Sequence, residues 1–97
     1  MSTDRQRIDK WLWHARIVRT RSAAADLAHA GFVRLNGARV NAASRAVRAG
    51  DVLTIALDGG VRVLKVVAFR DRRGSAEAAL ALYEDIGRGE RGRARGP

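Results

Sequence analysis

The sequence of 97 residues contains no cysteine, one proline, one methionine and few aromatic residues: two tryptophans, one tyrosine and two phenylalanines. Without cysteine, the chain forms neither a disulfide scaffold nor a thiolate metal site. No apolar run approaches the ~18 residues that a membrane-spanning helix needs. The first ten residues also lack the apolar core of a secretory signal. These absences predict a small cytoplasmic protein, and the length suits one domain.

Acidic residues are scarce as well, with ten against 19 basic residues and a net charge of +9. Arg outnumbers Lys by 17 to 2, a bias that a GC-rich genome also produces, so arginine content alone is weak support for a function. The excess of positive charge has no such explanation, because acidic codons are equally available. A balance this basic predicts an anionic partner: nucleic acid first, an anionic membrane second and an acidic protein third.

Apolar spacing predicts two helices near the N-terminus. Ile8, Trp11, Leu12 and Ala15 recur at helical intervals, which predicts a helix over residues 7–18. Thr20, or alternatively Ser22, is suited to cap a second helix that continues to Ala28 and stops at Gly31. Two short helices joined by a tight turn leave a helix-turn-helix open as an alternative.

Alternating segments predict a small antiparallel sheet behind these helices. Asn36-Gly37 favours a type I′ hairpin turn that places Arg34 opposite Arg39. Residues 52–57 and 61–69 are expected to form two further strands, whereas residues 41–49 look irregular. Ser75 is expected to cap a last helix that reaches Tyr83. The predicted fold class is therefore α+β, with two N-terminal helices packed on a small, mostly antiparallel sheet, plus a short C-terminal helix.

The sequence offers little for catalysis. His14 and His29 lack metal-ligand spacing, and no Ser-His-Asp arrangement stands in a supporting context. Asp9 lies near several cations on the first predicted helix, which suits a carboxylate that orients them better than a general base. We therefore expect no enzyme activity, no metal and no cofactor.

Basic side chains gather at the start of the second predicted helix. Unpaired N–H groups and the helix dipole favour an anion there. Arg19, Thr20, Arg21 and Ser22 surround this end, and Arg16 lies one turn earlier. On the hairpin, a phosphate between the opposed arginines would offset their repulsion; otherwise the two side chains splay apart in water. Because no aromatic residues alternate along a strand, we expect recognition of a folded RNA or duplex backbone rather than of stacked bases.

Six short motifs follow one another between residues 7 and 51: RIDKWL (7–12), TRSAAA (20–25), GFV (31–33), NG (36–37), VN (40–41) and VRAGD (47–51). Together they resemble the S4-type RNA-binding domain, a resemblance that extends over residues 7–57. It implies a fold of two helices on a small sheet. It also places an RNA-binding face on this chain. With the residues singled out above, that face comprises Arg7, Asp9, Lys10, Arg16, Arg19, Thr20, Arg21, Ser22, Arg34, Asn36, Gly37 and Arg39.

More narrowly, the sequence is similar to the heat shock protein 15 family. The similarity rests on DKWLW (9–13), on the arginine pair at 72–73, and on SAEAA (75–79) and LYE (82–84). It implies a stand-alone bacterial protein that binds the large ribosomal subunit carrying a stalled nascent chain and helps to recycle it. The implied partners are structured RNA, chiefly that of the large subunit, then tRNA or DNA, with no membrane. We expect a monomer.

Three segments are expected: an S4-like domain over residues 7–69, a linker with the C-terminal helix over 70–86, and a disordered Arg/Gly tail over 87–97. Two alternative functions stay open. One is a helix-turn-helix-like DNA-binding protein, although Asp26 and His29 on the second predicted helix are poorly suited to recognise base edges. The other is a generic nucleic-acid-binding protein.

Overall fold

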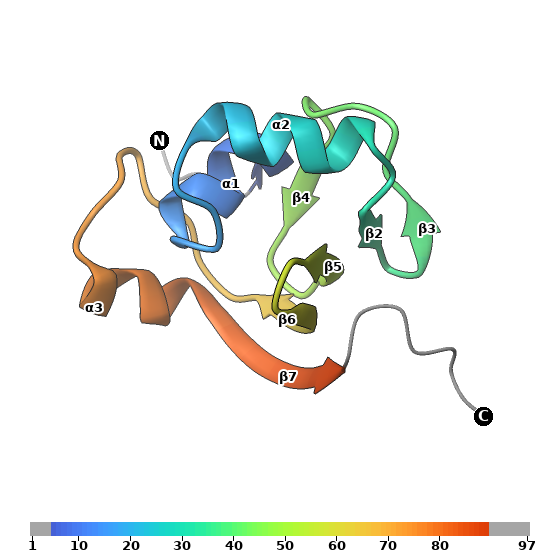
Figure 1. Ribbon diagram of the computed structural model, residues 1–97. Helices are drawn as coiled ribbons and strands as arrows, with labels where there is room; N and C mark the ends of the chain where they lie inside the picture. The colour runs from blue at the N-terminus through green and yellow to red at the C-terminus, as the bar shows by residue number, and fades with distance from the viewer. Residues whose placement is uncertain (1–4, 90–97) are drawn as a thin grey trace.

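The computed structural model of the chain describes residues 5–89 (Figure 1). Its helices are α1 (Ile8–His14), α2 (Arg21–His29) and α3 (Ala76–Ala79), with a 3-10 turn, η1, at Leu80–Leu82. Its strands are β1 (Arg5–Arg7), β2 (Val33–Leu35), β3 (Ala38–Arg39), β4 (Ala46–Arg48), β5 (Val52–Leu57), β6 (Gly60–Val66) and β7 (Tyr83–Gly89). The predicted α+β class is confirmed.

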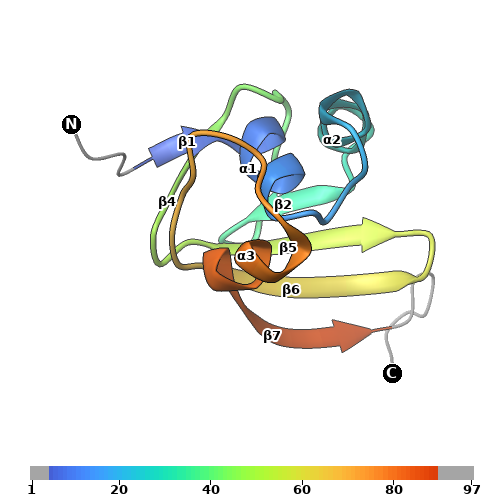
Figure 2. The same ribbon diagram turned by 90° about the vertical axis from the view of Figure 1, so that its left-hand side faces the viewer.

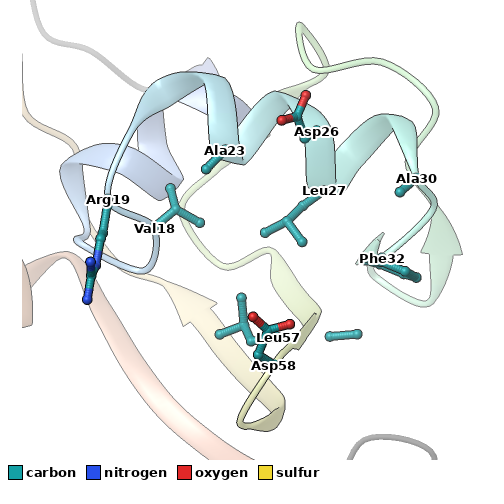
Figure 3. A pocket seen from close by; sticks show the side chains of 10 residues that line it. Val18, Arg19, Ala23, Asp26, Leu27, Ala30, Phe32, Leu57 and Asp58 are labelled. Carbon is teal, nitrogen blue, oxygen red and sulfur yellow. The ribbon is translucent and has the colours of Figure 1, made fainter.

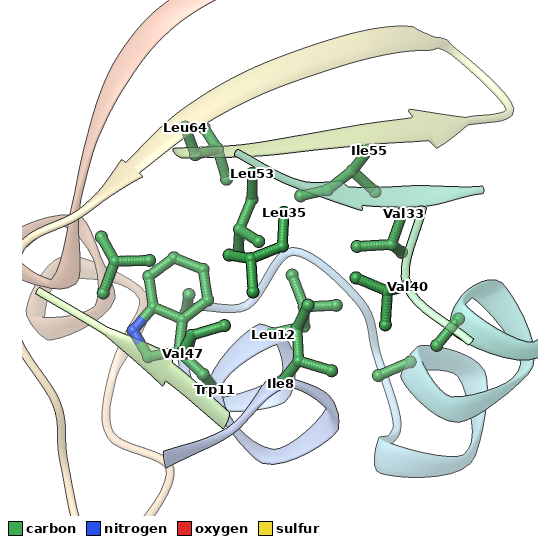
Figure 4. Close-up of a cluster of buried hydrophobic side chains, with 14 of the residues drawn as sticks. Ile8, Trp11, Leu12, Val33, Leu35, Val40, Val47, Leu53, Ile55 and Leu64 are labelled. Carbon is green, nitrogen blue, oxygen red and sulfur yellow. The ribbon is translucent and has the colours of Figure 1, made fainter. Parts of the chain in front are cut away.

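The strands form two antiparallel sheets. One has five strands in the order β3-β2-β5-β6-β7, and the other is a ribbon of β1 and β4. Helices α1 and α2 lie together on one side of the larger sheet (Figures 1 and 2). The core forms between them: Ile8, Trp11 and Leu12 of α1 meet the inward side chains of β2, β5 and β6 (Figure 4). All three are fully buried, as the helical spacing predicts.

Helix α1 is shorter than the predicted 7–18, because the chain turns sharply after Ala15. Arg16 adopts a positive φ of 58°, and its N–H donates to the Trp13 carbonyl over 3.1 Å. The Ile17 N–H donates to the Leu12 carbonyl over 3.0 Å, which completes a Schellman-type stop. This stop redirects the chain towards the start of α2.

Helix α2 has the predicted boundaries. The Thr20 hydroxyl accepts the Ala23 N–H at 3.0 Å, so Thr20 and not Ser22 is the cap. At the other end Gly31 has φ 83°, and the N–H of Phe32 donates to the Leu27 carbonyl over 2.9 Å. Glycine suits this position because a positive φ costs it little.

The Asn36-Gly37 hairpin also forms with the predicted register, with Arg34 opposite Arg39. Both turn residues have positive φ, 51° and 87°, as a type I′ turn requires. The Asn36 side chain accepts the Val52 N–H at 2.8 Å and donates to Asp51 over 3.1 Å. Asn36 thereby ties the hairpin to the start of β5.

Other local predictions were also wrong. Residues 46–48, expected to be irregular, pair with β1, and strand β6 ends at Val66 rather than at 69. The last helix begins at the predicted Ser75 cap but ends as α3 at Ala79, and Tyr83 opens a strand that pairs along β6. Residues 87–89 of the expected tail complete that strand, and residues 90–97 lie outside the described part of the chain.

The C-terminal segment packs on the same core as the first half. The Trp11 indole N–H donates to the Ala68 carbonyl over 3.0 Å, and the Trp11 ring meets Tyr83 edge-on at a centroid distance of 6.4 Å. Trp13 is half-buried beneath the Arg73 guanidinium, whose carbon lies 5.6 Å from the ring centroid. Residues beyond 69 thus hold α1 in place.

Candidate nucleic-acid interface

The start of α2 presents unpaired backbone donors among basic side chains. Arg19, Thr20, Arg21 and Ser22 are all exposed there, and the first turn holds no acidic residue. Thr20 caps the Ala23 N–H, whereas the N–H groups of Arg21 and Ser22 find no acceptor among residues 5–89. Together with the helix dipole, this arrangement suits a bound anion.

A buried carboxylate organises the cations beside this helix start. Asp9 is only 4% exposed, and its two oxygens accept hydrogen bonds from Nε and Nη2 of Arg7 at 3.1 and 3.0 Å. Nε of Arg21 lies 3.7 Å from the same carboxylate. The side chains of Arg7 and Arg21 remain 52% and 44% exposed. Asp9 therefore holds two guanidinium groups from separate elements in one place while leaving much of each open to solvent.

Two other predicted residues, Lys10 and Arg16, lie on or just after α1 with different roles in the structure. Lys10 is half-buried, and its side chain makes no ion pair within the described part of the chain. Nε and Nη2 of Arg16 both donate to the Gly74 carbonyl, over 3.0 and 2.8 Å. Arg16 thus fastens the C-terminal segment to the turn after α1.

The hairpin residues lie at the opposite end of α2 (Figure 1). Helix α2 has nine residues and is therefore about 13 Å long. The predicted RNA-binding residues thus divide into two groups, one at each end of this helix. The Arg39 guanidinium lies over Gly31, in the space that a Cβ there would fill, and Nη1 of Arg34 is 3.4 Å from the Gly37 carbonyl. The two opposed arginines therefore have separate contacts. Both remain exposed.

A third basic group, on the β1–β4 ribbon, joins the predicted Arg7 with Arg5 and Arg48, which were not among the predicted site residues. Arg5 lies opposite Arg48, and Arg7 lies opposite Ala46. Each strand has three residues, too short for alternation to stand out, and this explains why the group was missed. A sequence signal for this group did exist. In RQR (5–7) and AVR (46–48) the arginines occupy alternating positions, and the structure exposes these arginines while it covers the residue at the middle of each strand.

His14 is buried next to this basic surface without joining it. It is 1% exposed, its ring lies tilted by 39° against Trp13 at a centroid distance of 5.3 Å, and neither ring nitrogen has a hydrogen-bond partner among the described residues. Burial lowers the pKa of His14 from 6.5, the nearby Arg70 backbone opposes this shift, and the charges of Lys10 and Arg21 add to it. His14 is therefore neutral at pH 7.

A groove of about 470 Å³ lies between α2 and the end of β5 (Figure 3). Val18, Leu27, Phe32 and Leu57 make most of its lining apolar, and Arg19 lies at its edge. Residues 5–89 contain no cluster of three or more potential metal ligands. Within the same residues, no helix is long and apolar enough to cross a membrane.

Comparison with known proteins agrees with this architecture. The S4 domain family model matches residues 6–53. The heat shock protein 15 homolog of Aeromonas salmonicida is 38% identical over 84 residues, which are 87% of this chain and 63% of the relative. Heat shock protein 15 of Escherichia coli is 37% identical over 79 residues, 81% of this chain and 59% of the relative. The chain thus spans about three fifths of the length of these curated relatives.

A solved structure is similar over a larger share of its length. The chain described as the trimeric structure of Vibrio cholerae heat shock protein 15 is 33% identical, with a TM-score of 0.79. The similarity covers 84% of this chain and 82% of that one. With the S4 domain in its first half and this likeness along the remainder, the chain belongs to the heat shock protein 15 family.

Proposed function

We propose that this chain is a non-catalytic RNA-binding protein that binds ribosomal RNA of the large subunit and aids recycling of subunits with stalled nascent chains. The observation that carries the proposal is the arrangement around Asp9. Its buried carboxylate holds the half-exposed guanidinium groups of Arg7 and Arg21 beside the open start of α2. Family membership supports an RNA ligand for this arrangement, and a ribosomal partner supports a cytoplasmic location.

In this proposal one phosphate group of the RNA docks at the start of α2. The N–H groups of Arg21 and Ser22 donate to it, and the guanidinium forks of Arg7 and Arg21 neutralise it. Arg34 and Arg39, at the far end of α2, meet a second part of the same backbone. Such contacts read the shape of a folded RNA and not its bases. Binding therefore weakens steeply as salt rises, because each phosphate contact releases counterions.

The test is co-sedimentation with purified ribosomal subunits at low and moderate salt, with and without nascent-chain tRNA on the large subunit. We expect the chain to migrate with the large subunit, most strongly when nascent-chain tRNA is present. Arg21→Gln should weaken this binding roughly tenfold, since a charged hydrogen bond contributes about 1.5–3 kcal/mol when fully formed and Arg21 is partly solvated.

Lys65→Gln is the matched control, because Lys65 is exposed on β6, away from α2, and its loss changes the net charge equally. Equal binding by the Arg21 and Lys65 variants would contradict the proposed site. Uniform binding to every RNA, lost at moderate salt, would contradict the ribosomal role.

A further inference from the structure

The β1–β4 ribbon has one packed face and one basic face. Val47 is fully buried, and opposite it the Gln6 side-chain amide donates to the Arg70 carbonyl over 2.8 Å. Side chains alternate along a strand, so the neighbours of these two residues lie on the other face. That outer face carries Arg5, Arg7 and Arg48, with the small Ala46 among them. All four residues are exposed.

The pairing of Arg5 with Arg48 is unfavourable in the protein alone. They lie directly opposite each other in an antiparallel pair, where like charges repel. Neither guanidinium makes an ion pair or hydrogen bond within residues 5–89. Asp51, the carboxylate nearest in sequence to Arg48, accepts hydrogen bonds from the backbone N–H of Arg48 at 2.8 Å and from the Asn36 side chain at 3.1 Å. A bound anion is what would turn this repulsion into attraction.

The ribbon is also continuous with the start of α2. Arg7 belongs to the outer face of β1 and is bonded to Asp9, which in turn pairs with Arg21. One row of guanidinium groups therefore leads from Arg48 and Arg5, through Arg7, to Arg21. A row of this kind matches a ligand with repeated anionic groups better than it matches a single ion.

We propose that the outer face of the β1–β4 ribbon is a second phosphate-binding surface, which engages the sugar–phosphate backbone of the same RNA next to the α2 site. This inference rests on the proposed function. Guanidinium forks suit phosphate oxygens, and the face carries neither an aromatic ring nor an amide that could read a base. The ribbon thus adds affinity and orientation with no preference for sequence.

The experiment measures binding of the full chain to a fluorescein-labelled RNA hairpin by anisotropy between 50 and 300 mM KCl. The test variant is Arg5→Gln with Arg48→Gln. We expect its plot of log affinity against log salt to be shallower by about 1.4–1.8, the loss of two phosphate contacts. The matched control is Lys65→Gln with Arg72→Gln, which removes the same charge from exposed positions elsewhere and should change the slope by less than half as much.

Thermal unfolding separates a binding defect from a folding defect. Because the substitutions remove like charges that face each other, the test variant should unfold at the same or a higher temperature than the wild type. Arg5→Lys with Arg48→Lys keeps both charges and should keep most of the salt slope. If Arg5→Gln with Arg48→Gln changes the salt slope no more than Lys65→Gln with Arg72→Gln does, the ribbon site is wrong. That result would not contradict the α2 site.

Two further outcomes would also overturn the proposal. If the wild-type chain shows no salt-dependent RNA binding, the proposed function fails and the ribbon site fails with it. If the ribbon substitutions leave RNA binding intact but abolish binding to vesicles of phosphatidylserine and phosphatidylcholine, the face belongs to a membrane surface and not to RNA.

Discussion

At the scale of single residues, Asp9 and His14 are the buried polar side chains of the described part of the chain, and both belong to α1. Asp9 accepts charged hydrogen bonds, whereas His14 has no such partner. The difference follows from what each can do: a carboxylate beside arginines satisfies both groups, but a charged imidazole beside Lys10 and Arg21 would add repulsion. Asp9 thus stays a carboxylate that positions cations, and His14 is packed as a neutral ring.

The role of Asp9 leads to a prediction that opposes simple charge counting. Asp9→Asn raises the net charge, yet we expect RNA affinity to fall roughly tenfold, because Arg7 and Arg21 lose the group that holds them. The free energy of unfolding should fall by about 1–3 kcal/mol. Anisotropy and urea unfolding measure the two effects. Asp26→Asn, an exposed change of the same charge on α2, should bind RNA as tightly as the wild type or more tightly. Tighter binding by Asp9→Asn would count against a positioning role.

The lowered pKa of His14 predicts a loss of stability in acid. Below pH 6.5 His14 is protonated in the unfolded chain but stays neutral in the folded chain. The free energy of unfolding therefore decreases as pH falls from 6.5 towards the pKa of His14 in the folded chain. His14→Phe keeps a ring against Trp13 and should flatten this dependence between pH 7 and 5. Urea unfolding at several pH values checks it, with His29→Gln, an exposed site, as the control. An unchanged pH dependence in His14→Phe would assign the effect to other groups.

At the scale of elements, most helices and strands here are too short to persist alone. Helix α1 has seven residues, fewer than the ~12–15 that make an isolated helix even marginal in water. Its end is held from a distant part of the chain: Nε of Arg73 donates to the Trp13 carbonyl over 3.0 Å, and Nη2 donates to the Val18 carbonyl over 3.3 Å. The segment after residue 69 therefore stabilises the elements that form the basic surface.

Arg73→Gln should lower the unfolding temperature by about 5 °C, because it removes the hydrogen bonds to the Trp13 and Val18 carbonyls and uncovers the Trp13 ring. The neighbouring Arg72 offers a matched control, since it is exposed and its side chain makes no hydrogen bond or ion pair within residues 5–89. Arg72→Gln should leave the temperature within about 1 °C. Circular dichroism on both variants measures the difference. Equal shifts in the two would show that Arg73 acts only through its charge.

At the scale of the whole molecule, basic groups surround α2. They lie at its start, on the hairpin at its end, and on the ribbon that Asp9 connects to it. This spread suits a ligand longer than one phosphate.

The oligomeric state is also a property of the whole molecule. The Vibrio cholerae relative is described as a trimer, whereas for this chain the expectation from sequence is a monomer.

Sedimentation equilibrium of the purified chain over a range of concentrations measures its assembly. Self-association would raise the mass above the 10.6 kDa of one chain as concentration rises. Adding the RNA hairpin then shows which form binds. A constant mass of one chain would confirm the monomer expected from sequence and would restrict the trimer to the relative.

Features that depend on neighbours along the chain follow from the amino-acid sequence alone. Thr20 caps α2 and Gly31 ends it, and Asn36-Gly37 turns the hairpin, because each of these depends on local hydrogen bonds and on permitted φ values. The apolar spacing of Trp11 and its neighbours also identified the buried face of α1. The family motifs lie in these same segments.

The contacts between segments that are distant along the chain follow from the packing of the folded protein. Tyr83 opens a strand rather than extending a helix, because the open edge of β6 offers a ladder of hydrogen bonds that local propensity does not record. Residues 46–48 became a strand because β1 lies beside them. The pairing of Asp9 with Arg21 depends on how α1 and α2 pack, and so does the basic row that it completes. Contacts of this kind depend on distance in space, which spacing along the chain does not record.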